Sequence, residues 1–360
     1  MTVLQVPLNT RTYFVKIGYS LFKKNSMIYP FKPGDKVMLV TNENIANIWS
    51  NKVVSHLENL GVQTNQVILP DGEQYKTLKS LDIIITELLR CHYNRNCKLI
   101  GLGGGVIGDL TGFAASVYQR GINYIQIPTT LLAQVDASIG GKTAVNHVLA
   151  KNMIGTFWQP SKVIIDIKFL STLSKKELIS GLSEVIKYAV AFDLDFFGWL
   201  EKYYKDVLRL DYWAVMYCIK KCCKIKSLIV SEDEKENSCR VLLNLGHTYA
   251  HAIESFSNYK WLHGEAVAVG IIIASYTSHV LGHMNINDVY RIINLIKNVG
   301  LPIESPKNMD VKSYVLLMKR DKKIFNEEYL RLVLPIKIGE ATVFEKVNTK
   351  VVEQAIIKCM

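Results

Sequence analysis

The sequence predicts an α/β N-terminal domain with a parallel sheet, followed by a mainly α-helical C-terminal domain. Three observations lead to this prediction. The chain has 360 residues, which is more than one hydrophobic core usually holds, so two domains are expected. Short apolar runs alternate with helical stretches up to about residue 166, whereas helical periodicity dominates after residue 170. We therefore expect domains over residues 1–170 and 171–360.

Five short apolar runs in the first half have the length and composition of strands. They are residues 36–40, 66–70, 98–102, 123–128 and 162–166. The stretches between them are predicted to be helical, notably residues 73–89 and a helix that opens at Thr129. Such alternation indicates parallel βαβ units, in which a ligand binds at the carboxyl ends of the strands.

The second half carries apolar residues at helical spacing, for example Leu178, Leu182 and Val185. The pattern predicts helices over residues 174–190, 193–208, 211–230, 240–257, 263–281 and 286–299. Near the end, residues 329–335 are predicted to form a small strand and residues 349–359 a last helix.

The composition is that of a packed globular chain, with 49% apolar and 21% charged residues. Seven cysteines, an odd number without a CxxC pair, argue against a disulfide scaffold. We expect Cys218, Cys222 and Cys223 to lie on a buried or half-buried helix face. The N-terminus lacks a signal-peptide pattern, and the uncharged residues 266–287 fit a buried helix better than a membrane span. These features predict a cytoplasmic protein.

The net charge of +11 is compatible with a nucleic acid, a membrane surface or an acidic small molecule as partner. A nucleic-acid binder would show a basic stripe with interleaved aromatic residues or a known module, and the sequence has neither. Instead, several basic residues stand singly beside glycine, asparagine or apolar segments, a setting typical of pockets for phosphate or carboxylate. They are Lys142, Lys151, Lys187, Lys226, Arg240 and Lys322.

A glycine cluster follows the predicted strand at residues 98–102. Gly103, Gly105 and Gly108 fit the pattern GxGxxG between a strand and a helix. Glycine suits this position because a β-carbon would keep the backbone away from a pyrophosphate, whose charge a helix N-terminus favours. No acidic residue follows about 20 positions later, where a ribose ligand is expected. The pattern alone leaves two alternatives, a dinucleotide site and a plain strand–helix turn.

Two histidine-containing segments and one acid suggest a metal site. His247 and His251 are four residues apart, so one helix face presents both. His263 lies at the start of the next predicted helix, and Glu184 stands inside an otherwise apolar stripe. Two imidazoles and a carboxylate with a position left open can hold a catalytic divalent ion, zinc first. The alternatives are structural histidines and a Glu184 that only pairs with Lys187.

Eight continuous motifs, taken together and in this order, resemble the 3-dehydroquinate synthases, a family of the sugar-phosphate cyclase superfamily. They lie at residues 71–78, 103–116, 120–146, 151–160, 180–189, 240–254, 263–270 and 320–323. The resemblance runs from about residue 35 to residue 340. It implies a dehydroquinate synthase-like fold with NAD on the α/β domain and a divalent metal, usually zinc with cobalt possible, in the helical domain.

The resemblance also implies an activity. The family is a group of lyases that convert 3-deoxy-D-arabino-heptulosonate 7-phosphate to 3-dehydroquinate and phosphate, in the shikimate pathway of chorismate and aromatic amino acid biosynthesis. NAD takes up hydride and returns it, so no net oxidation occurs. Two other enzymes stay open as alternatives, a sister cyclase for another sugar phosphate and an NAD-dependent metal polyol dehydrogenase of similar fold.

Carried over motif by motif, the resemblance makes Glu184, His247 and His263 the metal ligands. The upstream residues Glu73 and Lys76 would hold the adenosine ribose and so replace the missing downstream acid. The full set expected at the cofactor is Asn42, Glu73, Lys76, Gly104, Gly105, Val106, Asp109, Thr129, Thr130, Lys142, Lys151, Thr172, Leu173 and Glu177. The set expected at the substrate is Asp136, Lys142, Asn152, Lys187, Lys226, Arg240, Asn244, His251 and Lys322.

The resemblance also implies roles within the substrate set. His251 is the candidate for proton transfer near the phosphate, since histidine titrates near neutrality. Lys142, Asn152 and Lys322 are expected to hold the phosphate, while Arg240 and Lys226 are expected to hold the carboxylate.

One further resemblance concerns assembly. Arg120 matches an arginine that reaches the phosphate site of the neighbouring subunit, which implies a homodimer. Leu245, Ser174 and Tyr249 depart from the residues common in the family, and none of the three performs chemistry.

Overall fold

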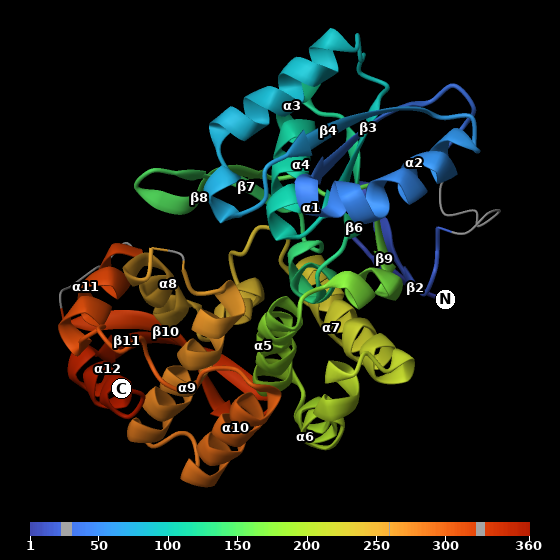
Figure 1. Ribbon diagram of the computed structural model, residues 1–360. Helices are drawn as coiled ribbons and strands as arrows, with labels where there is room; N and C mark the ends of the chain where they lie inside the picture. Colours follow the sequence, from blue (N-terminus) through green and yellow to red (C-terminus); the bar gives the residue numbers. More distant parts are fainter. Residues whose placement is uncertain (23–30, 259, 322–327) are drawn as a thin grey trace. The chain divides into compact units, whose positions relative to one another are not determined.

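The computed structural model describes residues 1–22, 31–258, 260–321 and 328–360 (Figure 1). Contacts within the chain divide it into two units. Unit 1 comprises Met1–Leu173 together with Lys226–Lys235, and unit 2 comprises Ser174–Ile225 together with Glu236–Met360. The predicted boundary after residue 170 assigns Lys226–Lys235 to the second domain, whereas the contacts place this segment in unit 1.

Unit 1 is built on a sheet with seven strands over the described residues, in the order β1-β2-β9-β6-β5-β3-β4. The strands are β1 (Thr2–Val6), β2 (Tyr13–Gly18), β3 (Lys36–Asn42), β4 (Gln63–Leu69), β5 (Lys98–Gly103), β6 (Asn123–Pro128) and β9 (Lys162–Asp166). β1 and β2 are antiparallel, and the other pairs are parallel. The five predicted strands and their parallel arrangement are confirmed. β1 and β2 are additional, and most side chains of β1 stay accessible, so no apolar run marks it.

Alternate side chains of β3 pack on opposite faces of this sheet. Met38 and Val40 join a core with α3 (Leu78–Arg90) and α4 (Gly105–Val117). Val37 joins the other core, which includes side chains from α2 (Asn51–Glu58). Because both faces of the parallel sheet are covered, its central strands are apolar throughout, which explains why they appear in the sequence as continuous runs.

The remaining helical segments of unit 1 are short. They are η1 (Asn9–Arg11), α1 (Glu43–Ile45), η2 (Ala46–Ser50), η3 (Glu73–Tyr75), η4 (Tyr118–Arg120), η5 (Ala133–Ala137) and η6 (Ile167–Thr172). The helix predicted over residues 73–89 is divided, because Thr77 caps α3 by accepting a hydrogen bond from the Ser80 amide. The helix predicted to open at Thr129 contains the short π-helical segment η5.

A hairpin of β7 (Lys142–His147) and β8 (Ala150–Phe157) forms a separate antiparallel sheet. No strand is predicted there from the sequence, because most side chains of β8 are exposed or half-buried and carry no apolar run. Gly155 allows the close approach of the two strands: a β-carbon at this position would lie 2.1 Å from the Thr143 carbonyl oxygen.

Unit 2 is mainly helical, as predicted. Its elements are α5 (Lys175–Phe192), α6 (Leu194–Leu208), η7 (Cys239–Asn244), α8 (His247–Phe256), α9 (His263–Val280), α10 (Ile286–Val299), α11 (Val311–Asp321), β10 (Tyr329–Lys337), β11 (Glu340–Asn348) and α12 (Thr349–Ile357). The helix α7 (Tyr212–Glu232) has residues in both units. The central helix α9 contacts α5, α8, α10, α12 and β10 and is buried along most of its length.

One prediction for unit 2 is wrong. The helix expected over residues 240–257 is interrupted at Gly246, whose φ of +79° lies in the left-handed region that favours glycine. A β-carbon on Gly246 would lie 2.8 Å from the Ile271 backbone nitrogen of α9. The close approach of α9 therefore requires glycine here, and α8 begins afresh at His247.

The apolar segment at residues 266–287 lies largely within α9, and its burial confirms that it is a core helix. In the described parts of the chain, no helix is long and apolar enough to cross a membrane. The structure describes all seven cysteines and joins none of them in a disulfide, and Cys218, Cys222 and Cys223 are buried, as predicted.

We predict that only Cys91 and Cys239, which are partly exposed, react quickly with iodoacetamide in the native protein. Burial raises the pKa of Cys97 to about 11 and that of Cys359 to about 12, so little reactive thiolate is present at neutral pH. Mass spectrometry of alkylated peptides, with and without denaturant, measures this difference. Rapid labelling of Cys218 in the native protein would contradict the prediction.

Candidate functional site

Three side chains of unit 2 converge on one point. Glu184 is fully buried in α5, His247 is the first residue of α8, and His263 is the first residue of α9. The Nε2 atoms of His263 and His247 lie 3.3 Å and 3.6 Å from Oε1 of Glu184. One ligand atom from each residue lies within 4.8 Å of the other two. The structure thus brings together the acid and two of the three histidines singled out in the sequence.

Small residues allow this convergence. The Gly264 amide donates a hydrogen bond to Oγ of Ser180, and a β-carbon on Gly264 would lie 1.9 Å from the Ser180 carbonyl oxygen. At the other contact, a β-carbon on Gly270 would lie 2.2 Å from the Gly246 carbonyl oxygen. α9 can therefore approach both α5 and the start of α8, which carries His263 to Glu184.

The pKa values of the two histidines shift in opposite directions. Burial lowers the pKa of His247 to about 3, although Glu184 opposes this shift. Burial would also lower the pKa of His263, but the carboxylates of Glu254 and Glu184 outweigh it and raise that pKa to about 10. Lys187 adds an ammonium group 2.5 Å from Glu184. The site thus favours the neutral form of His247 and the charged form of His263.

The donor set fits a divalent ion. Two imidazole nitrogens and one carboxylate oxygen, with room for a further ligand, are the donors of a catalytic zinc site. The side chain of His263 remains 31% exposed, so this side of the cluster is accessible from outside. His251 lies one turn after His247 on α8, and the two rings are perpendicular at 5.8 Å.

The glycine cluster of unit 1 joins β5 to α4. Gly104 is the N-cap of α4 in an extended conformation, and the first-turn amides that follow are those that helix geometry leaves without intrahelical acceptors. A β-carbon on Gly108 would lie 2.7 Å from Oε1 of Gln126 in β6, so glycine lets the helix lie close to the sheet. A helix N-terminus presented by glycines at the end of a parallel strand fits a pyrophosphate.

Several residues predicted at the cofactor form one network in unit 1. Lys76 donates to Oδ2 of Asp109 at 2.5 Å and also to Oδ1 of Asn152, a residue predicted at the substrate. Burial raises the pKa of Asp109, although Lys76 opposes this shift. Glu73 accepts a hydrogen bond of 2.8 Å from Asn146 and lies 3.6 Å from the ammonium of Lys151.

The other predicted cofactor residues lie at separate places. Asn42 ends β3, caps α1 and donates to Asp71. Thr172 accepts a hydrogen bond of 2.8 Å from the Trp49 indole. Leu173 is the last residue before unit 2, whereas Glu177 lies in the first turn of α5. Positions on or beside α4, β6 and β7 hold Gly105, Val106, Thr129, Thr130 and Lys142.

The remaining predicted substrate residues are distributed over both units. Lys226, on the part of α7 that belongs to unit 1, donates to Oδ1 and the carbonyl oxygen of Asp136. In unit 2, Arg240 is buried in η7, and Asn244 donates to Glu236 at 2.8 Å. Arg120 lies at the end of η4. Lys322 falls outside the described residues.

Two acids of unit 2 that were not predicted from the sequence contact predicted site residues. Glu236 accepts from Asn244, and Glu254 lies 3.3 Å from Nδ1 of His263. The position of Glu254, seven residues after His247, was a usable signal, because that spacing places both residues on one face of α8.

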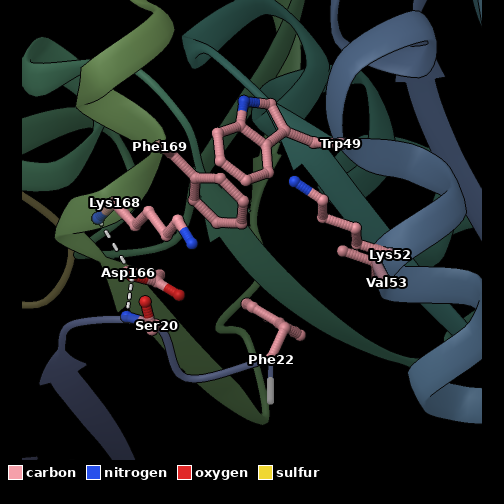
Figure 2. A pocket seen from close by; sticks show the side chains of 8 residues that line it. All are labelled: Ser20, Phe22, Trp49, Lys52, Val53, Asp166, Lys168 and Phe169. Carbon is pink, nitrogen blue, oxygen red and sulfur yellow. Dashed lines mark hydrogen bonds between the residues drawn. The ribbon is translucent and has the colours of Figure 1, made fainter.

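Figure 2 shows a small hollow of unit 1 that contains none of the predicted site residues. It is lined by Ser20, Phe22, Trp49, Lys52, Val53, Asp166, Lys168 and Phe169. Its volume of about 40 Å³ leaves room for a few water molecules and excludes a nucleotide. The Asp166 carboxylate accepts hydrogen bonds from the amides of Ser20, Leu21 and Lys168, so it holds the surrounding backbone in place.

Solved structures with a similar fold define the class. A 2-epi-5-epi-valiolone synthase from Streptomyces hygroscopicus is 24% identical, with a TM-score of 0.90 over 96% of each chain. A 2-deoxy-scyllo-inosose synthase is also 24% identical, with a TM-score of 0.88 over 100% of each chain. An iron-containing alcohol dehydrogenase from Thermotoga maritima is less similar, at 14% identity and a TM-score of 0.66 over 96% of this chain and 97% of that one. The chain therefore has the fold of the dehydroquinate synthase-like cyclases.

The sequence identifies the family within this class. The models of the 3-dehydroquinate synthase N-terminal and C-terminal regions match residues 66–180 and 181–324. A 3-dehydroquinate synthase from Buchnera aphidicola is 54% identical over 355 residues, which cover 98% of this chain and 100% of the relative. The chain belongs to the 3-dehydroquinate synthase family, which confirms the resemblance of its motifs.

We predict that Gly264→Ala separates α9 from α5 and lowers the free energy of unfolding by about 1–3 kcal/mol, because its β-carbon meets the Ser180 backbone. The same shift moves His263 away from Glu184, so zinc binding weakens as well. Gly198→Ala in α6 is the matched control, since no atom lies within 4 Å of its β-carbon position and alanine is the better helix former. Denaturant unfolding measures both variants, and equal stability of the two would contradict the prediction.

Proposed function

We propose that this chain converts 3-deoxy-D-arabino-heptulosonate 7-phosphate to 3-dehydroquinate and inorganic phosphate. The observation that carries the proposal is the cluster of the buried Glu184 with the half-buried His247 and His263, which offers the donors of a catalytic divalent ion in a member of this family. The Buchnera relative bears the name of this enzyme and matches almost the whole chain.

NAD and a divalent ion, zinc with cobalt as the alternative, are the proposed cofactors. The valiolone synthase was solved with NAD+ and Zn2+, and the inosose synthase with NAD+ and Co2+. Glu184, His247 and His263 would hold the ion, while the start of α4 with Glu73 and Lys76 would hold the dinucleotide. When bound, the ion would make a substrate hydroxyl more acidic, and NAD would supply reversible hydride transfer.

The chain's own residues supply proton transfer around this chemistry. His251 is proposed to move a proton near the phosphate, because an imidazole can both accept and donate a proton. Lys187 lies 2.5 Å from Glu184 and favours its ionised form, which is the form that binds a cation. Lys187 is also proposed to contact the substrate.

Separate charged groups are proposed to hold the two anionic ends of the substrate. Lys142, Asn152 and Lys322 would hold the phosphate, whereas Lys226 and Arg240 would hold the carboxylate. Lys226 and Arg240 are buried, so their charges act with less screening by water than surface charges do. Asp136 and Asn244 complete the proposed substrate set.

The proposed partner is therefore an anionic sugar phosphate. We also propose that the protein works in the cytoplasm as a homodimer, in which Arg120 reaches the phosphate site of a second copy.

We predict that the purified protein, supplied with NAD and zinc, releases inorganic phosphate from the heptulosonate phosphate. A chelator should abolish the release and added zinc should restore it, because the ion acidifies the substrate hydroxyl. A phosphate assay run beside absorbance at the NADH wavelength tests this. Absence of release with zinc restored would refute the proposal, and NADH accumulation would favour the polyol dehydrogenase alternative.

We predict that the His251→Ala and His263→Ala variants both lose phosphate-releasing activity, but for different reasons. His251→Ala should lower kcat by about 10²–10⁴-fold through loss of proton transfer, with zinc content unchanged. His263→Ala should lose the zinc itself, because it removes one of three protein donors. Elemental analysis beside the phosphate assay separates the two effects. Stoichiometric zinc in His263→Ala would refute the ligand assignment.

A further inference from the structure

We propose that Glu254 is a positioning residue that orients His263 as a metal ligand. The inference rests on the proposed function, because it requires the divalent ion at Glu184, His247 and His263. It concerns a residue that belongs to neither the proposed ligand set nor the proposed substrate set.

The ring of His263 lies between two carboxylates. Its Nε2 atom is 3.3 Å from Oε1 of Glu184, and its Nδ1 atom is 3.3 Å from Oε1 of Glu254. Glu254 is only 3% exposed, so water competes little for this contact. A carboxylate on each side fixes the plane of the ring as well as its position.

The contact with Glu254 also selects a tautomer. An ionised carboxylate only accepts hydrogen bonds, so Nδ1 of His263 must donate its N–H to Glu254. When an ion binds, Nε2 gives up its proton and offers its lone pair on the side of Glu184, while Nδ1 keeps its N–H on Glu254. Metal-ligating histidines commonly donate their second N–H to a carboxylate or a backbone carbonyl, which raises their basicity as ligands.

His247 provides an internal comparison. Its Nδ1 atom lies 3.2 Å from the Leu245 carbonyl oxygen, a neutral acceptor, and its Nε2 atom also faces Glu184. Both histidines therefore present Nε2 to the same oxygen, but only His263 is supported by a charged group. Hydrogen bonds to a charged acceptor are roughly twice as strong as those between neutral groups.

The place of Glu254 in the fold explains why its effect reaches a different helix. Glu254 and His247 share one face of α8, whereas His263 begins α9. α8 therefore supplies one ligand directly and holds the other ligand through Glu254. A buried carboxylate at this position is costly unless it is paired, and the pairing with His263 provides the compensation.

The test measures zinc affinity of the full chain by competition with a chromophoric chelator. We expect Glu254→Ala to weaken zinc binding by about 10–100-fold, the range found for such supporting residues. Glu254→Gln should show a smaller but measurable loss, because its amide oxygen still accepts from Nδ1 without the charge. The visible spectrum of the cobalt-loaded Glu254→Ala protein should also shift, since the His263 ring is no longer fixed.

Tyr249→Phe is the matched control. It removes a buried 2.8 Å contact between α8 and Thr277 of α9, and Tyr249 lies outside the proposed ligand and substrate sets. It should bind zinc as the wild type does. Wild-type zinc affinity in folded Glu254→Ala, or an equal loss in Tyr249→Phe, would overturn the inference. If Glu254→Ala does not fold, the Glu254→Gln variant takes its place in the test. A zinc affinity of Glu254→Gln equal to that of the wild type then overturns the inference.

The two proposals fail in different ways. A wild-type chain that binds no zinc would refute the metal site and the proposed function with it. A His263→Ala variant that keeps full zinc binding would do the same. A wild-type chain that binds zinc at this cluster, with an affinity that Glu254→Ala leaves unchanged, would refute only the role of Glu254.

Discussion

The pairing of the buried Glu184 carboxylate with Lys187, His247 and His263 is the interaction on which the packing of α5, α8 and α9 depends. A carboxylate without exposed surface is costly inside an apolar helix unless cations or donors surround it. Lys187 lies next to it on α5, while His247 and His263 approach from α8 and α9. Because these groups come from three helices, the charge is compensated only when α5, α8 and α9 keep one arrangement.

Glycines reconcile that electrostatic requirement with close packing. Gly264 lets α9 touch the Ser180 backbone, and Gly270 lets it touch Gly246. The left-handed conformation of Gly246 starts α8 at His247. The same positions that carry the charged cluster therefore also carry the closest helix contacts, so a change in packing is at once a change in the proposed metal site.

Ion pairs also integrate a distant segment into unit 1. Lys226–Lys235 comes from the second half of the chain, yet it belongs to unit 1. Lys226 is held by Asp136, and Glu234 lies 2.6 Å from Arg11. No local sequence pattern predicts that this segment belongs to unit 1, because ion pairs between residues 90 or more positions apart form only in the folded chain.

The sequence by itself determined the elements with continuous apolar patterns, namely the five parallel strands and most helices, and its motifs identified the family. The spacing of His247 and His251 likewise predicted that both side chains lie on one helix face, since a helix face is set by local spacing. The family motifs also grouped Glu184 with His247 and His263. Only the tertiary structure gave the distances between these three residues, set Glu254 behind His263 and interrupted the predicted helix at Gly246. The physical reason is that these features depend on distances between packed helices, which local periodicity does not contain.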